Sequence, residues 1–304
     1  MTGMYASFCR FIAGVDFTWL LFIRPRDYTL WAGLCVACFL SLAGCGSDDS
    51  LQRIKDSGEL RVISRNGPTT YYEDKNGSTG FEYALASLLA DDLGVTLEML
   101  PSFSLAAIFE GLTRGEADLA AAGLTLTPER AAHFPHSQPY YKLKPQVIYK
   151  SGSFRPRSIA DLAGMKILTI SDSSHAKTLQ ALAEGSGEFL EVEQIKTSDS
   201  MELLHLVVTG EAPLAIMDSN EFTVQQALFP RLRVAFDIGK EQELTWYLTP
   251  TTDNSRLLAR ISRLFEHLEQ NGTMERLRQS HFVHARGVTR IGSHTFNRNM
   301  RKTL

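Results

Sequence analysis

The chain has 304 residues, of which 44% are hydrophobic, 21% charged and 10% aromatic. This mixture excludes an intrinsically disordered or collagen-like chain, and the length is sufficient for two units that each bury a core. With 31 Lys and Arg against 34 Asp and Glu, the formal net charge of -3 lacks the basic excess of a phosphate-binding surface, so we expect no nucleic acid partner.

The N-terminal region has the pattern of a secretory signal. All four cysteines lie within the first 45 residues, so the remaining chain has neither a disulfide nor a cysteine-based metal site. An uncharged apolar run over residues 28–44 follows Arg24 and Arg26 and ends in small residues. A short apolar stretch of this kind is typical of a cleaved signal rather than a membrane span. We therefore predict a signal peptide over residues 1–44, with an uncleaved anchor as the alternative.

The end of the apolar run, Leu42-Ala43-Gly44-Cys45, resembles a bacterial lipobox. The resemblance implies cleavage before Cys45 and acylation of its thiol. Gly46 follows the cysteine in place of an acidic residue, which resembles the sorting pattern of outer-membrane lipoproteins. We therefore expect a lipid anchor on the periplasmic side of the outer membrane, followed by a polar tether over residues 45–56.

Strands and helices then alternate. Residues 60–64 have the pattern of a strand, apolar residues recur at helical spacing over residues 81–93, and a second strand is predicted over residues 95–100. A helix over residues 104–114 then leads into an apolar strand over residues 119–122. This order predicts an α/β unit with a mainly parallel sheet.

The second half of the chain repeats this order. Gly115-Glu116-Ala117-Asp118-Leu119-Ala120 recurs 95 positions later as Gly210-Glu211-Ala212-Pro213-Leu214-Ala215, each time after an amphipathic helix. A strand, a helix and a strand are predicted over residues 165–170, 175–184 and 189–192. The repeat predicts two α/β lobes.

Polar residues follow the predicted strands, where open α/β sheets bind ligands. They are Arg65 and Asn66, residues 123–125, residues 171–174 and residues 218–220. Two lobes that present these ends to each other form a cleft.

The segment Thr125-Leu126-Thr127-Pro128-Glu129-Arg130 predicts a carboxylate site within this cleft. Thr127 and Pro128 are suited to begin a short helix. The first-turn amides, the Thr125 hydroxyl and the Arg130 guanidinium could then converge on a carboxylate. The alternative is a capped surface helix with a solvated arginine.

These motifs, together with Gly80-Phe81-Glu82-Tyr83 and Pro139-Tyr140, resemble the periplasmic amino-acid-binding family, solute-binding protein family 3. The resemblance implies a two-lobed type II clamshell, with lobe 1 over residues 57–148 plus 243–284 and lobe 2 over residues 149–242. In that family, residues matching Thr125 and Arg130 clamp the α-carboxylate of the ligand and one matching Asp218 holds its α-ammonium group. The loop containing Ser173 and Ser174 donates amide hydrogens on closure.

The resemblance narrows to the regulatory half of the membrane-bound lytic murein transglycosylase F family. It is carried over about residues 51–300 by segments that include residues 61–66, 173–176, 218–221 and 281–284. Members of that family continue into a lysozyme-like domain whose catalytic Glu precedes a Ser. This chain stops at Leu304 and contains no Glu-Ser pair, so the resemblance implies the sensor half without the catalytic domain. Residues 285–304 are then a basic connector, or alternatively touch an anionic glycan or membrane.

Several further side chains are assigned from the same patterns. Tyr71 and Tyr72 follow Arg65 closely and are expected to wall the cleft, as is Arg65 itself. Trp246-Tyr247 is expected to pack in the core. His175 is expected to be structural, with hydrogen-bond donation into the cleft as the alternative.

The histidine pairs His133/His136 and His281/His284 lack the further donors of a zinc site, and nucleotide or hydrolase motifs are absent. We therefore expect no metal, cofactor or catalytic residue. Two acids, Glu73 and Glu221, are the candidates if the chain is instead an enzyme that dehydrates a small acid, and both have solvated-loop explanations.

The sequence thus predicts a module that binds an amino acid or a muropeptide stem peptide and is linked to peptidoglycan turnover. The first alternative is an amino-acid-binding lipoprotein that serves a membrane transporter. Another alternative is a complete transglycosylase that has been shortened.

Overall fold

The first lobe is built on a five-stranded sheet. The structure, a computed structural model, describes residues 49–283. Four strands of this sheet share one direction, and β12 runs antiparallel to its neighbours β5 and β6. The strand order is β4 (Thr96–Ser102), β1 (Glu59–Arg65), β5 (Leu119–Thr125), β12 (Gln242–Leu248) and β6 (Tyr141–Leu143).

The second lobe repeats this architecture. Its five-stranded sheet again has a single strand, β7, that runs against the others. The order is β11 (Leu232–Asp237), β7 (Pro145–Lys150), β10 (Leu214–Asp218), β8 (Lys166–Ile170) and β9 (Glu191–Ile195). The predicted pair of mainly parallel α/β lobes is therefore confirmed.

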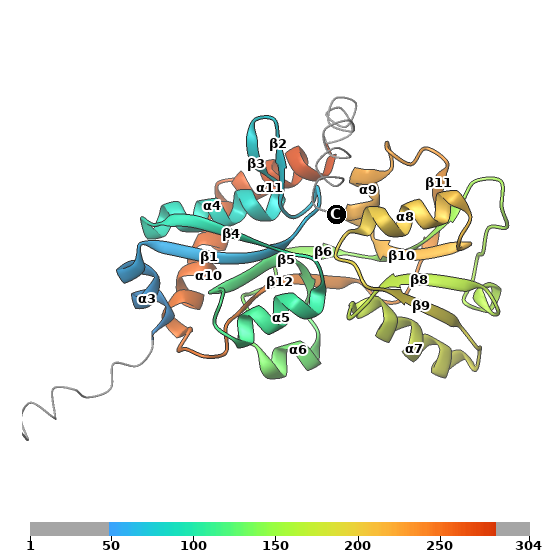
Figure 1. The fold of residues 1–304 in the computed structure, drawn as a ribbon, viewed down its shortest axis with the longest axis horizontal. Coiled ribbons are helices and arrows are strands. Elements are labelled where there is room, and N and C mark those ends of the chain that lie inside the picture. The colour runs from blue at the N-terminus through green and yellow to red at the C-terminus, as the bar shows by residue number, and fades with distance from the viewer. Residues whose placement is uncertain (1–48, 284–304) are drawn as a thin grey trace, which may run out of the picture. The chain divides into compact units, whose positions relative to one another are not determined.

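Helices cover both faces of each sheet (Figure 1). In the first lobe, α4 (Phe81–Leu93) and α10 (Ser255–Gln270) pack on one face and α5 (Leu105–Thr113) on the other. In the second lobe, α7 (Ser174–Ser186) and α8 (Ser200–Thr209) lie on opposite faces. The remaining elements are α6 (Pro128–His133), α9 (Ser219–Gln225), α11 (Thr273–Arg278), the short helices η3 (Ala160–Leu162) and η4 (Gln279–Val283), and a hairpin of β2 (Tyr72–Asp74) and β3 (Gly77–Thr79).

The predicted repeat places the central strand of each sheet. In the first lobe α5 is followed by Gly115 and β5, and in the second α8 is followed by Gly210 and β10. Both glycines have positive φ angles, 67° and 91°, which a residue with a Cβ adopts only at a cost. These turns bring β5 and β10 to the middle of their sheets, where each is buried on both faces.

One apolar cluster extends across both lobes. It joins Ile108 of α5 and Tyr247 of β12 to Ile148, Leu203 and Met217 of the second lobe. Burying each of these aliphatic side chains contributes roughly 1.5–3 kcal/mol. The two lobes therefore share part of their core.

The predicted polar tether over residues 45–56 is wrong in its second half, where α3 (Ser50–Ser57) forms. Asp49 caps this helix by accepting a hydrogen bond from the Leu51 amide at 3.0 Å. Leu51 and Ile54 are buried, because their three-residue spacing puts both on one helical face. Short polar stretches with only two apolar residues are easily taken for linkers.

The crossover between the lobes also lies earlier than predicted. All of β7 belongs to the second sheet, so the chain crosses at Lys144 rather than between residues 148 and 149. Pro145 is the first residue of β7, a position at which the missing N–H of a proline is tolerated.

Some predictions concern residues outside those described. They are the signal peptide over residues 1–44, the lipidated Cys45, the part of the tether before residue 49, His284 and the basic connector over residues 285–304. Within residues 49–283, no helix combines the length and apolar character needed to cross a bilayer.

Candidate functional site

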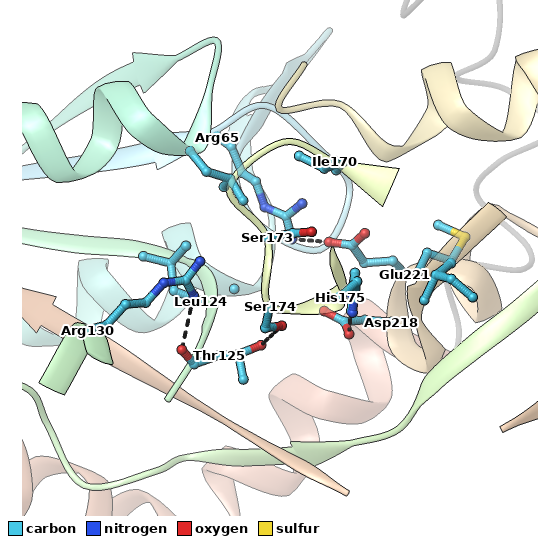
Figure 2. A pocket seen from close by; sticks show the side chains of 14 residues that line it. Arg65, Leu124, Thr125, Arg130, Ile170, Ser173, Ser174, His175, Asp218 and Glu221 are labelled. Atoms are coloured by element: carbon cyan, nitrogen blue, oxygen red, sulfur yellow. Dashed lines mark hydrogen bonds and ion pairs between the residues drawn. The ribbon is translucent and has the colours of Figure 1, made fainter. Parts of the chain in front are cut away.

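A small cavity lies where the two lobes meet, at the carboxyl ends of β1, β5, β8 and β10 (Figure 2). Its volume is about 30 Å³, room for only one or two water molecules. The lobes are therefore closed on each other. Of the predicted site residues, all but Tyr71 line this cavity, namely Arg65, Thr125, Arg130, Ser173, Ser174 and Asp218.

Arg130 is held by the short helix that the sequence predicts. Thr127 caps α6 and accepts a hydrogen bond from the Arg130 amide at 3.3 Å, and Pro128 is the first helical residue. The guanidinium donates to the Thr125 carbonyl at 3.1 Å and, across the cleft, to the Asp172 carbonyl at 2.8 Å. It also lies 4.9 Å from the centre of the Phe109 ring. Burial lowers its pKa from the usual value, so a carboxylate here meets a poorly hydrated cation.

Thr125 belongs to a hydroxyl network that spans both lobes. Its Oγ1 donates to Gln242 Oε1 at 3.2 Å, and the Ser174 hydroxyl donates to the same two oxygen atoms at 3.2 and 3.1 Å. The sequence did not indicate Gln242. Gln242 lies at the site because β12, which contains it, pairs antiparallel with β5.

Arg65 and Glu221 form a buried ion pair between the lobes, and Figure 2 shows their charged groups facing each other. Only 8% and 5% of the two side chains are exposed. Arg65 Nε also donates to the Ala122 carbonyl at 2.8 Å. The expectation that Glu221 lies in a solvated loop is therefore wrong. It occupies the first turn of α9, which begins directly after Asp218 and turns the side chain into the cleft.

Asp218 lies opposite Arg130 and beside His175, whose Nε2 is 3.4 Å from Asp218 Oδ1. Burial, and then the Glu221 charge, raises the pKa of Asp218 to about 8. Burial, and then Arg65 and Arg130, lowers the pKa of His175 to about 4. At neutral pH the contact therefore joins a protonated carboxyl to a neutral imidazole. Among the residues described, none forms a hydrogen bond with Asp218 Oδ1.

Tyr71 and Glu73 lie away from the cavity. The Tyr71 hydroxyl donates to Glu73 Oε1 at 3.2 Å, and the Tyr71 ring centre is 6.0 Å from that of Tyr83. Tyr72 begins the hairpin strand β2 and is also absent from the cavity lining. The assignment of the tyrosines to the cleft wall is wrong because the turn before β2 directs them toward the hairpin and α4.

The buried carboxyl of Glu82, for which no role was predicted from the sequence, holds the strand end next to the cavity. Glu82 accepts hydrogen bonds from the Gly123 amide at 2.9 Å, from Trp246 Nε1 at 2.7 Å and from the Tyr140 hydroxyl. Burial raises its pKa. These contacts fix Gly123, and with it the end of β5 that carries Thr125.

The expected core position of Trp246 and Tyr247 is confirmed, since both are fully buried. The Tyr247 hydroxyl donates to the Thr125 carbonyl at 3.0 Å and accepts from the Thr127 amide at 3.2 Å. It thereby connects the core to the loop that holds Arg130. Over residues 49–283, no group of three side chains is arranged to hold a metal ion.

The family model for bacterial extracellular solute-binding proteins, family 3, matches residues 60–284. The chain belongs to this family. The same residues carry the two lobes and every side chain that lines the cavity.

Two curated relatives of this family 3 protein are membrane-bound lytic murein transglycosylases F. The chain is 39% identical to that of Ectopseudomonas mendocina over 297 residues, which cover 93% of this chain and 59% of the relative. It is 38% identical to that of Pseudomonas savastanoi pv. phaseolicola over 289 residues, which cover 93% of this chain and 58% of the relative. The chain therefore spans less than two thirds of the length of these relatives.

Solved structures show the same fold. A substrate-binding protein of an amino acid ABC transporter from Streptococcus pneumoniae, bound to L-arginine, matches with a TM-score of 0.68 and 23% identity, over 77% of this chain and 98% of that one. An arginine-binding protein mutant from T. maritima matches with a TM-score of 0.69 and 22% identity, over 77% and 99%. The type II clamshell architecture expected for a family 3 solute-binding protein is thus confirmed.

Proposed function

We propose that this family 3 solute-binding protein is a ligand-sensing module linked to peptidoglycan turnover. It binds an amino acid or the stem peptide of a muropeptide between its lobes, from a lipid anchor at Cys45 on the periplasmic side of the outer membrane. The observation that carries the proposal is the meeting of Arg130 and Asp218, from opposite lobes, in one buried cavity.

The two ends of a zwitterion match these two side chains. Arg130 is half-buried and donates to main-chain carbonyls of both lobes. A ligand carboxylate can replace these carbonyls as the acceptor and form charge-assisted bonds. Asp218 Oδ1 is a buried acceptor that lacks a hydrogen bond from any described residue, and an ammonium group supplies the donor. Because an unpaired buried polar atom is costly, the site favours a ligand with both groups.

Closure of the lobes is the proposed signal. Thr125 of the first lobe contacts Ser174 of the second, and Arg130 contacts the Asp172 carbonyl. A ligand that contacts both lobes stabilises the closed form by the difference between its affinities for the closed and open forms. The similarity to lytic murein transglycosylases F supports a role in reporting wall fragments.

Titration calorimetry on the full-length chain tests the proposal with free amino acids and with muropeptides. Hydrogen bonds to charged groups contribute roughly 1.5–3 kcal/mol each, so we expect Arg130→Ala to weaken binding by about 100-fold. Arg114→Ala, which removes an exposed arginine of the first lobe, is the matched control and should bind like wild type.

Two results of this calorimetry would contradict different parts of the proposal. Equal affinities of wild type and Arg130→Ala exclude Arg130 from the site. Binding of free amino acids without any binding of muropeptides favours an amino-acid-binding lipoprotein of a membrane transporter over the peptidoglycan sensor.

A further inference from the structure

The cleft contains two arginines and two carboxyl groups, although a simple zwitterion needs only one of each. Both cations that line the cavity, Arg65 and Arg130, come from the first lobe, and both carboxyl groups, Asp218 and Glu221, come from the second. His175 adds no charge at neutral pH because burial lowers its pKa to about 4. The proposed function uses Arg130 and Asp218 and leaves the other pair unexplained.

The second pair, Arg65 and Glu221, does not have the character of a surface salt bridge. The two side chains are 8% and 5% exposed and come from different lobes. Burying an ion pair costs desolvation that its attraction often fails to recover, so such a pair is weak evidence for a purely stabilising role. Both side chains line the cavity in which the ligand is proposed to bind.

Ligand entry must disturb this pair. The closed cavity of about 30 Å³ holds one or two water molecules, so even a small amino acid enters only after the lobes have moved apart. Arg65 and Glu221 belong to opposite lobes and separate with them. When the lobes close again on a ligand, each of the two charges has to regain a partner in a site with little water.

We propose that the Arg65–Glu221 pair is a second head-group subsite and that the cleft selects ligands with two amino-acid head groups. One head binds between Arg130 and Asp218, and the other places its carboxylate on Arg65 and its ammonium group on Glu221. This inference rests on the proposed function because it uses the same cleft.

The number of charges that a ligand can pair in the cleft predicts which ligands bind most tightly. Once Asp218 has ionised on binding, a two-headed ligand supplies one partner for each of the two arginines and the two carboxylates and leaves none unpaired. Lysine or glutamate offers a third charge of one sign only, so either Glu221 or Arg65 gains a partner while the other loses its own. An unpaired buried charge strongly disfavours a complex. The aliphatic lining suits the hydrocarbon link between two heads and comprises Leu105, Leu124, Ile170, Ile216 and Met217.

Competition calorimetry on the full-length chain tests this order with diaminopimelate and L-cystine as two-headed probes and L-alanine, L-lysine and L-glutamate as one-headed probes. We expect both two-headed probes to bind at least about tenfold more tightly than alanine, and lysine and glutamate to bind more weakly than the two-headed probes. A wild-type chain that binds alanine as tightly as diaminopimelate overturns the inference.

A charge-neutral double variant isolates the subsite. Arg65→Gln combined with Glu221→Gln removes both charges without leaving either one unpaired, and it should reduce the ratio of diaminopimelate to alanine affinity toward one. The matched control, Arg114→Gln combined with Glu116→Gln, changes an exposed pair with 55% and 54% exposed side chains and should keep the wild-type ratio. Preference for diaminopimelate that survives in the cleft variant contradicts the inference.

Failure of the inference can be separated from failure of the proposed function. Alanine binding that depends on Arg130 but shows no two-headed preference overturns only the second subsite. The absence of binding by every probe and by muropeptides overturns both. The wild-type ranking does not depend on the folding of any variant.

Discussion

In the proposed function, Asp218 is the side chain whose protonation changes when a ligand binds. Its pKa is raised to about 8 by burial, so most of it is protonated at pH 7 in the closed, ligand-free form. A protonated carboxyl cannot form an ion pair with an ammonium group, whereas the carboxylate can. Binding therefore requires that Asp218 lose its proton.

We expect ligand binding at pH 7 to release up to one proton, and the affinity to rise as the pH increases from 6.5 toward 8. The sign follows because a higher pH favours the ionised form of Asp218, while the ammonium group of an amino acid stays protonated over this range. Calorimetry in buffers with different ionisation enthalpies measures the number of protons released. Asp218→Asn should release none and bind more weakly, and a wild-type chain that takes up protons contradicts this role.

The residues whose place at the cavity could be predicted from the sequence are those that belong to local patterns. Thr125 and Arg130 lie in one helix-starting segment, and Asp218 follows a strand that echoes an earlier one. Gln242 escaped prediction because its position depends on a returning strand. Glu221 was interpreted as an acid in a solvated loop because its burial depends on the opposite lobe. Tyr71 was misplaced because sequence proximity to Arg65 does not give the direction of the following turn.

At the scale of elements, α3 shows how much structure a short polar segment can contain. Gln52, Lys55 and Asp56 face solvent. Leu51 and Ile54 join the core of the first lobe. The helix also positions Arg53, which forms an ion pair with Asp118 at 2.8 Å. Residues 50–57 are therefore part of the folded lobe.

Ile54→Ala should destabilise the protein because Ile54 is 1% exposed and its removal leaves a cavity. Substitutions of this type cost about 2–5 kcal/mol. Urea denaturation of both proteins measures the difference in the free energy of unfolding. Gln52→Ala, on the exposed face of the same helix, is the control and should change stability little. Equal stabilities of Ile54→Ala and wild type would show that the segment does not pack on the lobe.

At the scale of the whole molecule, the closed form depends on contacts that cross the cleft. Besides Arg65–Glu221, they include the Lys177–Glu129 ion pair and the Ser198 hydroxyl, which donates to the Ser102 carbonyl at 2.9 Å. The exposed pair contributes roughly 0–1 kcal/mol, whereas breaking a buried pair costs about 3–5 kcal/mol. Removing one partner of Arg65–Glu221 is therefore expected to disfavour closure more than removing one partner of the exposed pair.

Arg65→Ala should shift the ligand-free protein toward an open form. The carboxylate of Glu221 loses its partner in the closed cavity and regains hydration when the lobes separate. Small-angle X-ray scattering should then give a larger radius of gyration than for wild type. Arg61→Ala, which removes an ion pair within the first lobe, should leave that radius unchanged. An unchanged radius for Arg65→Ala would show that the other contacts suffice for closure.

The shared apolar cluster has a consequence for how the molecule melts. Ile108 and Tyr247 pack in the same cluster as Ile148 and Leu203. If one lobe unfolds, apolar side chains of the other lobe are therefore exposed to water. Scanning calorimetry should accordingly record one cooperative heat-absorption peak, so that damage to either half lowers the melting temperature of both.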